Sequence, residues 1–206
     1  MKKRNLFITF EGTEGSGKST QIKRAAVYLK KKGLKVLLLR EPGGTRVSEA
    51  IREVILDKTL KEMTSETELL LYLAARAQII KEKIRPALEK GVTVICDRFE
   101  DSTLAYQGFG RGFQIQRIEA LSQWLVRGSL KPDMTFLLDI DPRLGMKRGG
   151  RQDRIERESL VFHRKVRQGF LKLAAKHPRR FVVMDALQSR DAIAQKIKER
   201  LDHELG

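Results

Sequence analysis

The segment from Gly12 to Ser19, GTEGSGKS, has the residue types and the spacing of a loop that binds phosphate groups. It matches the pattern G-x-x-x-x-G-K-[ST] at every position and directly follows an apolar run. Glycines allow backbone conformations in which several N–H groups converge on phosphate oxygens at the beginning of a helix. Lys18 can reach the β- and γ-phosphates of a nucleotide, and the Ser19 hydroxyl can ligate Mg²⁺. The predicted ATP-binding residues are Gly12, Thr13, Glu14, Gly15, Ser16, Gly17, Lys18, Ser19 and Thr20.

Phosphate chemistry at such a loop also needs an acid at the end of a neighbouring strand, which holds the water shell of the metal. Two acids meet this requirement: Asp97, which ends the apolar run that begins at Val92, and Asp139, which ends the run that begins at Phe136. We favour Asp97, because Arg98 follows it directly and puts a cation where phosphates would meet. Asp139 could equally end a strand and cap a helix. The predicted metal-binding residues are Ser19, Glu41 and Asp97.

Two further segments gather polar side chains. Arg40 and Glu41 end an apolar run and precede the turn signal Pro42-Gly43-Gly44, so we expect them at the carboxyl edge of a sheet, where open α/β sheets bind ligands. The segment Asp97–Gly108 combines charges, hydroxyls, aromatic rings and an amide. Tyr72 and Arg76 are four residues apart on one face of a predicted helix, although packing and a solvated arginine would explain that pair as well.

Four segments occur in the order EGTEGSGKST, LREPGGT, DRFEDSTLAYQGFGRG and DRIERES. Together they resemble the bacterial thymidylate (dTMP) kinase family over essentially the whole chain. The resemblance implies a three-layer α/β/α fold of the P-loop NTPase type, with a five-stranded parallel sheet, a short lid and one domain over residues 1–206. It also implies ATP with Mg²⁺ as the phosphoryl donor, dTMP as the acceptor and dTDP as the product.

The same resemblance implies a role for each residue around dTMP. Glu14 would contact the 3′-hydroxyl side of the deoxyribose, and Tyr106 would crowd C2′ and disfavour ribonucleotides. Tyr72, where phenylalanine is usual in the family, would stack on thymine. These roles agree with the chemistry, since arginine forks match phosphate and a flat base needs an aromatic face. The phosphate would be surrounded by Arg40, Arg52 and Arg98, and the polar edge of the base by Arg76 and Gln107, with Ser102 and Thr103 nearby.

The segment Arg148–Arg154 resembles the lid of the family, which we expect at about residues 146–156. No variable position of the phosphate loop is basic, so a cation outside the loop must neutralise the charge of the transition state. Two adjacent glycines would let the lid segment close over the bound nucleotide and supply that cation. Because the second pKa of a phosphate monoester is about 6, the acceptor needs no general base. The predicted catalytic cations are Lys18, Arg98 and one of Arg148, Arg151 and Arg154, of which we favour the last two; alternatively, Asp153 pairs with one of these arginines.

The elements that position these residues follow from the apolar pattern. Five short runs read as buried strands, and the segments between them have helical periodicity, which indicates a parallel sheet covered on both faces. The motif Ser65-Glu66-Thr67-Glu68 predicts a capping box at the beginning of a long helix, which Pro86 should kink or restart. The predicted strands are 6–10, 36–39, 92–96, 135–138 and 181–184, and the further predicted helices are 21–32, 115–126, 156–175 and 190–204.

The composition limits the function classes. The chain of 206 residues carries 42 Lys and Arg against 26 Asp and Glu, a net charge of +16 that suits polyanionic partners. Cys96 is its one cysteine and cannot form an internal disulfide, which fits a reducing compartment. No run approaches the roughly 20 apolar residues of a membrane helix. The stretch before Glu11 is too short for the apolar part of a signal peptide. We therefore expect a cytoplasmic protein without a membrane partner.

Two alternatives remain at this point: another P-loop kinase that acts on a different nucleoside or nucleotide, and an NTPase that depends on nucleic acid, motivated by the positive charge. The second is disfavoured because the chain is short and its motifs place together residues suited to binding a nucleoside monophosphate. We therefore expect no obligatory nucleic acid. The resemblance implies a homodimer, and Leu121, Trp124 and Leu125 could serve either its interface or the core.

Overall fold

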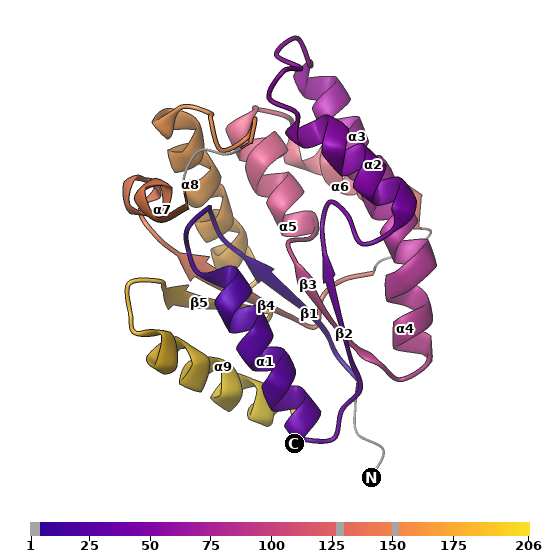
Figure 1. Ribbon diagram of the computed structural model, residues 1–206, viewed down its shortest axis with the longest axis vertical. Helices are drawn as coiled ribbons and strands as arrows, with labels where there is room; N and C mark the ends of the chain where they lie inside the picture. The colour runs from indigo at the N-terminus through magenta and orange to yellow at the C-terminus, as the bar shows by residue number, and fades with distance from the viewer. Residues whose placement is uncertain (1–4, 127–129, 150–152) are drawn as a thin grey trace.

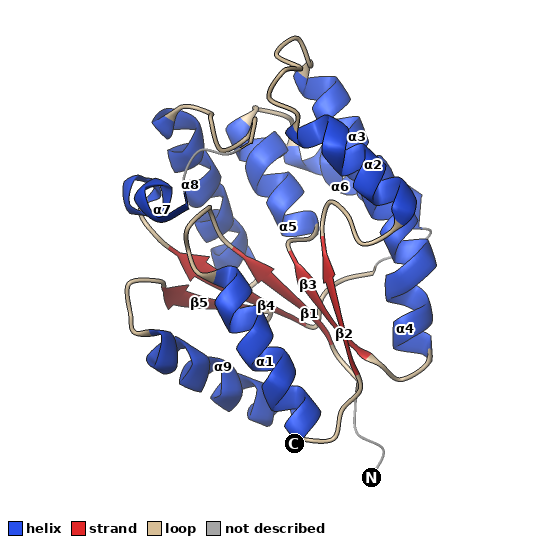
Figure 2. Cartoon of the chain, in the orientation of Figure 1, coloured by secondary structure: helices blue, strands red, loops and turns tan. Residues whose placement is uncertain are grey.

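The computed structural model describes residues 5–126, 130–149 and 153–206. Its centre is a parallel sheet in the order β2-β3-β1-β4-β5, with helices on both faces (Figures 1 and 2). This confirms the predicted fold class, and each predicted strand is correct to within one residue at either end. The strands are β1 (Phe7–Glu11), β2 (Val36–Arg40), β3 (Thr93–Asp97), β4 (Met134–Asp139) and β5 (Phe181–Asp185).

The side chains of β1 alternate between the two faces of the sheet, as strand geometry requires. Ile8 and Phe10 pack with α1 (Lys18–Lys31) and α9 (Arg190–Leu205), which lie together on one side of the sheet (Figure 1). Phe7 points to the opposite face, toward Ile79 and the helices that follow it. The three inner strands, β3, β1 and β4, are buried on both faces, which is why they are nearly continuous apolar runs in the sequence, whereas the edge strands β2 and β5 are partly exposed.

The second face of the sheet carries most of the remaining helices and the two π-helical turns. α8 (Leu160–Lys176) packs on η2 (Leu104–Gly110), which continues α5 (Glu100–Thr103). α2 (Arg46–Leu56) packs on α3 (Ser65–Ile79), which also contacts α6 (Ile115–Val126). α7 (Pro142–Gly149) follows β4 directly.

Several predicted helix ends need correction. The cap of α3 is Thr64, whose hydroxyl accepts the Thr67 amide, so Ser65 is already helical and the proposed capping box is wrong. α8 begins at Leu160, capped by Ser159, four residues later than predicted. α1 begins at Lys18, three residues earlier than predicted, because the phosphate loop leads straight into it.

The restart at Pro86 is confirmed. The long helix α3 passes through the π-helical turn η1 (Ile80–Ile84), and α4 (Arg85–Glu89) then begins with Pro86 in its first turn. Proline is tolerated there because the first N–H groups of a helix have no partner inside it. α5 with η2 and α7 were not predicted, because their apolar residues are few or interrupted by glycine. α2 was not predicted either, although Val47, Ile51 and Ile55 recur with helical spacing.

Candidate active site

The phosphate loop joins β1 to α1 and is held by its own lysine. The Lys18 ammonium donates to the carbonyl oxygens of Gly12 (2.9 Å) and Thr13 (3.0 Å), so the loop is closed around it. Gly15 has a φ of 70°. A Cβ on Gly15 would overlap the carbonyl oxygen of Gly145, so only glycine fits where α7 packs on the loop.

Asp97 and Arg98 lie at the carboxyl edge of the sheet, beside this loop. The register pairs Asp97 with Phe10 of β1 and with Arg40 of β2, which brings the ends of three strands together. Arg98 has a φ of 68°, a left-handed conformation that a side chain rarely adopts and that is associated with functional sites. Its guanidinium donates to Glu14 (2.8 Å) and to the Ser102 hydroxyl (3.3 Å). Arg98 thus bridges the phosphate loop and α5.

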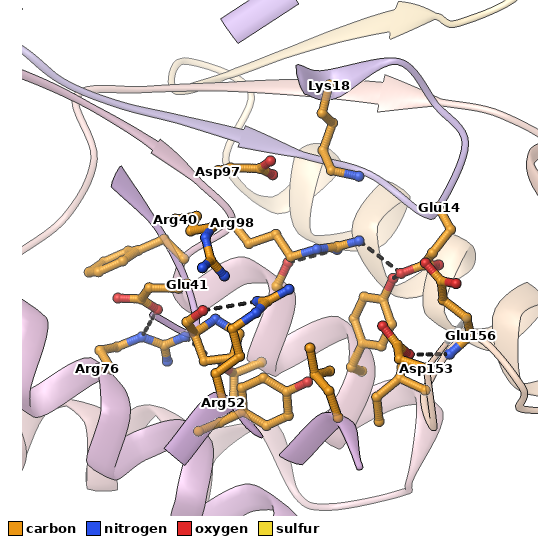
Figure 3. Close-up of a pocket in the computed structure, with 18 of the residues that line it drawn as sticks. Glu14, Lys18, Arg40, Glu41, Arg52, Arg76, Asp97, Arg98, Asp153 and Glu156 are labelled. Carbon is orange, nitrogen blue, oxygen red and sulfur yellow. Dashed lines mark hydrogen bonds and ion pairs between the residues drawn. The ribbon is translucent and has the colours of Figure 1, made fainter. Parts of the chain in front are cut away.

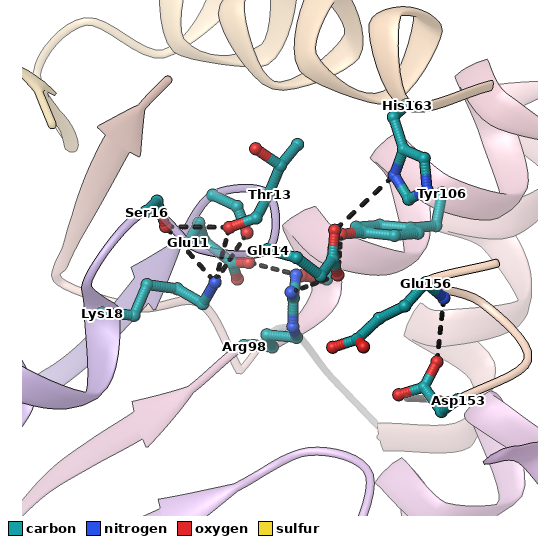
Figure 4. A network of polar contacts seen from close by, with 12 residues as sticks. Glu11, Thr13, Glu14, Ser16, Lys18, Arg98, Tyr106, Asp153, Glu156 and His163 are labelled. Carbon is teal, nitrogen blue, oxygen red and sulfur yellow. Dashed lines mark hydrogen bonds and ion pairs between the residues drawn. The ribbon is translucent and has the colours of Figure 1, made fainter. Parts of the chain in front are cut away.

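Glu11, the last residue of β1, holds the loop that carries Arg98. It is fully buried and lies near Lys18 (Figure 4). Its carboxylate accepts the Phe99 amide (2.8 Å) and the Ser102 hydroxyl (2.5 Å). Burial raises the pKa of Glu11 to about 8, and the nearby charge of Asp101 acts in the same direction. The sequence analysis did not select this residue, although a carboxylate that ends a buried strand is a signal that could have found it.

Glu14 has a different electrostatic environment. Its carboxylate accepts from Arg98 and from the Tyr106 hydroxyl (2.6 Å), and the buried His163 ring lies 3.6 Å away. Burial by itself would raise the pKa of Glu14, but the charges of Arg98 and Lys18 outweigh it and hold the pKa below its usual range. Glu14 is therefore an ionised acceptor at neutral pH. Burial also lowers the pKa of Lys18 to about 8, and the charge of Arg98 contributes to this shift.

A cavity of about 320 Å³ lies between the phosphate loop and α3 (Figure 3). Every residue that the sequence assigned to dTMP lines it, and these residues come from the phosphate loop, β2, α2, α3, the end of β3, α5 and η2. Asp153, Ile155 and Glu156, which belong to the predicted lid segment, lie along the same cavity. The structure therefore brings together Glu14, Arg40, Arg52, Tyr72, Arg76, Arg98, Ser102, Thr103, Tyr106 and Gln107.

The arginines around this cavity differ in how they are held. Arg40 donates to Glu49 (2.8 Å) and is half-exposed, whereas Arg52 donates to the carbonyl oxygen of Pro42 (2.9 Å). Arg76 is buried: its Nε donates to Glu41 (2.8 Å) and its Nη2 to Thr103 (2.7 Å), while its buried Nη1 has no hydrogen-bond partner. Arg76 thus lines the cavity and keeps one buried donor without a partner.

A second cavity, of about 730 Å³, lies on the other side of the phosphate loop. It is lined by the loop from Gly15 onward, by Arg148 and by residues from Ala186 to Ile193. Gly15, Lys18 and Ser19 line both cavities. A group bound in one cavity can therefore meet a group bound in the other at Lys18, which is the geometry that a transfer between two bound molecules needs.

Of the two acids predicted to hold a metal, Asp97 is close enough to act on the charge of Lys18 at this meeting point, whereas Glu41 is bound to Arg76. Asp97 and Glu41 each keep one buried carboxylate oxygen without a hydrogen-bond partner, and both line the first cavity with Ser19. Oxygen donors of this kind suit Mg²⁺, which keeps several waters and takes few protein ligands. Asp139 instead receives two hydrogen bonds from Arg167, both 2.7 Å, so the contacts favour Asp97 over Asp139.

The lid arginines are separated in the structure. Arg148 lines the second cavity and donates to the carbonyl oxygen of Ala186 (3.3 Å). Arg154 donates to the carbonyl oxygen of Ile55 (3.0 Å) and to Glu68 (2.6 Å), away from the phosphate loop. Arg151 lies outside the described residues, as does Gly150. Asp153 accepts the Glu156 amide (2.9 Å).

Three comparisons with known proteins agree with one another. The family model described as thymidylate kinase matches residues 10–197. A thymidylate kinase of Magnetococcus marinus is 50% identical over 195 residues, which cover 93% of this chain and 92% of that protein. One of Deinococcus radiodurans is 49% identical, covering 93% and 94%. The crystal structure of a thymidylate kinase from Ehrlichia chaffeensis, 34% identical, matches 97% of this chain and 99% of that one with a TM-score of 0.79.

Proposed function

The chain belongs to the thymidylate kinase family, and from this membership we propose that it transfers the γ-phosphoryl group of ATP to dTMP, giving ADP and dTDP. The observation that carries the proposal is the pair of cavities that meet at Gly15, Lys18 and Ser19. We assign ATP to the larger cavity, behind the phosphate loop, and dTMP to the smaller one, which holds the arginines and Tyr72. We treat residues 1–206 as one domain.

The chemistry in this proposal is positioning and charge neutralisation. The nucleophile is a phosphate oxygen of dTMP, which is mostly dianionic at neutral pH and needs no general base. Arg98 holds that phosphate with Arg40 and Arg52, while Lys18 and the amides of the phosphate loop hold the phosphates of ATP. Glu14 accepts the 3′-hydroxyl, and Tyr106, fixed by its hydrogen bond to Glu14, lies against C2′.

The oxygen donors of Ser19, Asp97 and Glu41 fit Mg²⁺, and these residues would hold the ion or its water shell. When bound, Mg²⁺ neutralises charge on the transferring phosphoryl group. We further propose that a lid arginine adds to this neutralisation. Arg148 is supported by its place along the ATP cavity. Arg154 would first have to leave Glu68, and Arg151 keeps the support of the sequence alone.

We also propose that the protein is a cytoplasmic homodimer that needs no nucleic acid. Dimerisation is supported by exposed apolar side chains on α2, α3 and α6, helices that pack side by side. Trp124 is the most exposed of these side chains, with 76% of its surface accessible, whereas Leu125 packs against a core cluster. None of the described helices is long and apolar enough to cross a membrane. The exposed apolar side chains on these helices are Val47, Val54, Leu70, Leu121 and Trp124.

The test of the proposed function is a panel of acceptors with Mg-ATP, scored by the nucleoside diphosphate formed. The panel contains dTMP, dUMP, dCMP, dGMP, AMP and thymidine, with and without added DNA or RNA. We expect the highest kcat/KM with dTMP and no dependence on nucleic acid. A preference for another acceptor would favour a different kinase, and ATP hydrolysis stimulated by nucleic acid without transfer to dTMP would favour the NTPase.

A further inference from the structure

Glu68 is a buried carboxylate behind the base end of the dTMP cavity, and four donors converge on it. It lies in the first turn of α3, and 1% of its surface is exposed. Its Oε1 accepts from Gln107 Nε2 (2.9 Å) and Arg111 Nε (3.1 Å), and its Oε2 from Arg111 Nη2 (2.9 Å) and Arg154 Nη2 (2.6 Å). Glu68 does not line the cavity itself. Whatever it does for the substrate, it does through these partners.

The contact with Gln107 has a direct consequence for the cavity. An ionised carboxylate can accept hydrogen bonds but cannot donate them. Burial would raise the pKa of Glu68, but hydrogen bonds from Arg111 and Gln107 outweigh it and hold the pKa below its usual range. The amide of Gln107 must therefore turn its Nε2 toward Glu68, and it keeps its Oε1, an acceptor, for the cavity that it lines.

Arg76 supplies the complementary atom on the same cavity. Its Nε and Nη2 are bound to Glu41 and Thr103, and its buried Nη1 remains as a donor without a partner. The cavity thus presents a fixed donor and a fixed acceptor to the base. Thymine offers the matching pair, with O4 as acceptor and N3–H as donor, whereas cytosine offers an amino donor at C4 and an acceptor at N3.

We propose that Glu68 is a positioning residue that makes the base cavity select thymine over cytosine, by fixing the orientation of the Gln107 amide. The inference rests on the proposed function, because it concerns the base of the same acceptor. A site built to hydrogen-bond one pattern rejects the opposite pattern strongly, since its buried polar groups would be left unpaired. Without the negative charge at Glu68, the amide can rotate and satisfy either base.

The test is the ratio of kcat/KM for dTMP to kcat/KM for dCMP, measured in the wild-type protein and in Glu68→Gln. The new amide can donate to Gln107 as well as accept from it, so both orientations become available. We expect the ratio to fall by about 10-fold or more, with KM for ATP changed by less than about twofold. The matched control is Glu82→Gln: Glu82 accepts from Gln78 Nε2 at 3.0 Å but is exposed, and we expect no change in the ratio.

A double-mutant cycle separates this role from a general structural one. In a Gln107→Leu background there is no amide to orient, so Glu68→Gln should leave the ratio unchanged. If Glu68→Gln does not fold, Glu68→Asp replaces it, because it keeps the charge for both arginines but withdraws the carboxylate from Gln107 by one methylene. An unchanged ratio in the folded single variant, or the same decrease in both backgrounds, overturns the inference. A wild-type protein that does not phosphorylate dTMP overturns the proposed function instead.

Discussion

Replacement of Arg76 by alanine tests the buried ion pair at the base end of the cavity. Arg76 and Glu41 are joined at 2.8 Å, and their side chains are 5% and 4% exposed. Removal of one partner of such a pair leaves an uncompensated charge and costs about 3–5 kcal/mol of unfolding free energy. For a domain of this size, about 2–4 °C per kcal/mol gives a decrease in Tm of about 6–20 °C. The loss of the free Nη1 donor should also raise KM for dTMP by about 5- to 150-fold.

The destabilisation should depend on pH with a definite sign. Burial already raises the pKa of Glu41 above 4.5, and Arg76 is the main group that lowers it again. Without Arg76 the folded-state pKa rises further, so the folded variant binds a proton that the unfolded chain does not hold. The stability of Arg76→Ala is therefore highest below the unfolded pKa and is lost as the pH rises through the folded pKa. We expect the Tm difference from the wild type to be larger at pH 8 than at pH 5.

The assay combines thermal unfolding at both pH values with steady-state kinetics for each substrate. The control is the double variant Arg76→Met with Glu41→Gln, which removes both charges and should recover most of the Tm but not the KM for dTMP. The reasoning is refuted if Arg76→Ala melts within about 2 °C of the wild type at pH 8. It is also refuted if the single variant raises KM for ATP instead of KM for dTMP, because the two cavities would then have been exchanged.

Three further outcomes are expected. Lys18→Ala should lower kcat by at least about 10²-fold with the fold intact, whereas Lys31→Ala, at the exposed end of the same helix, should have no effect; normal turnover of the first variant would remove the loop from the mechanism. Among Arg148→Lys, Arg151→Lys and Arg154→Lys, the variant that replaces the catalytic arginine should lose kcat with little change in dTMP binding, because lysine keeps the charge but not the bidentate geometry. If all three variants turn over normally, the lid does not stabilise the transition state. Trp124→Glu should shift the protein from dimer to monomer in light scattering, and an unchanged mass would place the interface elsewhere.

Much of this protein could be predicted from local patterns. The strands follow from short apolar runs, because the inner strands are buried on both faces of a parallel sheet and keep few polar positions. The phosphate loop follows from its glycines and lysine, since their chemistry depends on neighbours in the chain. The resemblance of four short segments to one family named residues that the fold then gathers around one cavity.

Only the tertiary structure decided which distant groups meet. Glu68 looks like a capping residue in the sequence, yet it is buried and binds Gln107, Arg111 and Arg154, which are between 39 and 86 positions away. The contacts also favour Asp97 over Asp139 as the metal-binding acid, because the Asp139 carboxylate is already bound by Arg167. The sequence indicates which side chains can carry charge, but their partners depend on how the helices pack on the sheet. Burial then determines how strongly each pair interacts, because the cost of an unpaired charge rises as water is excluded.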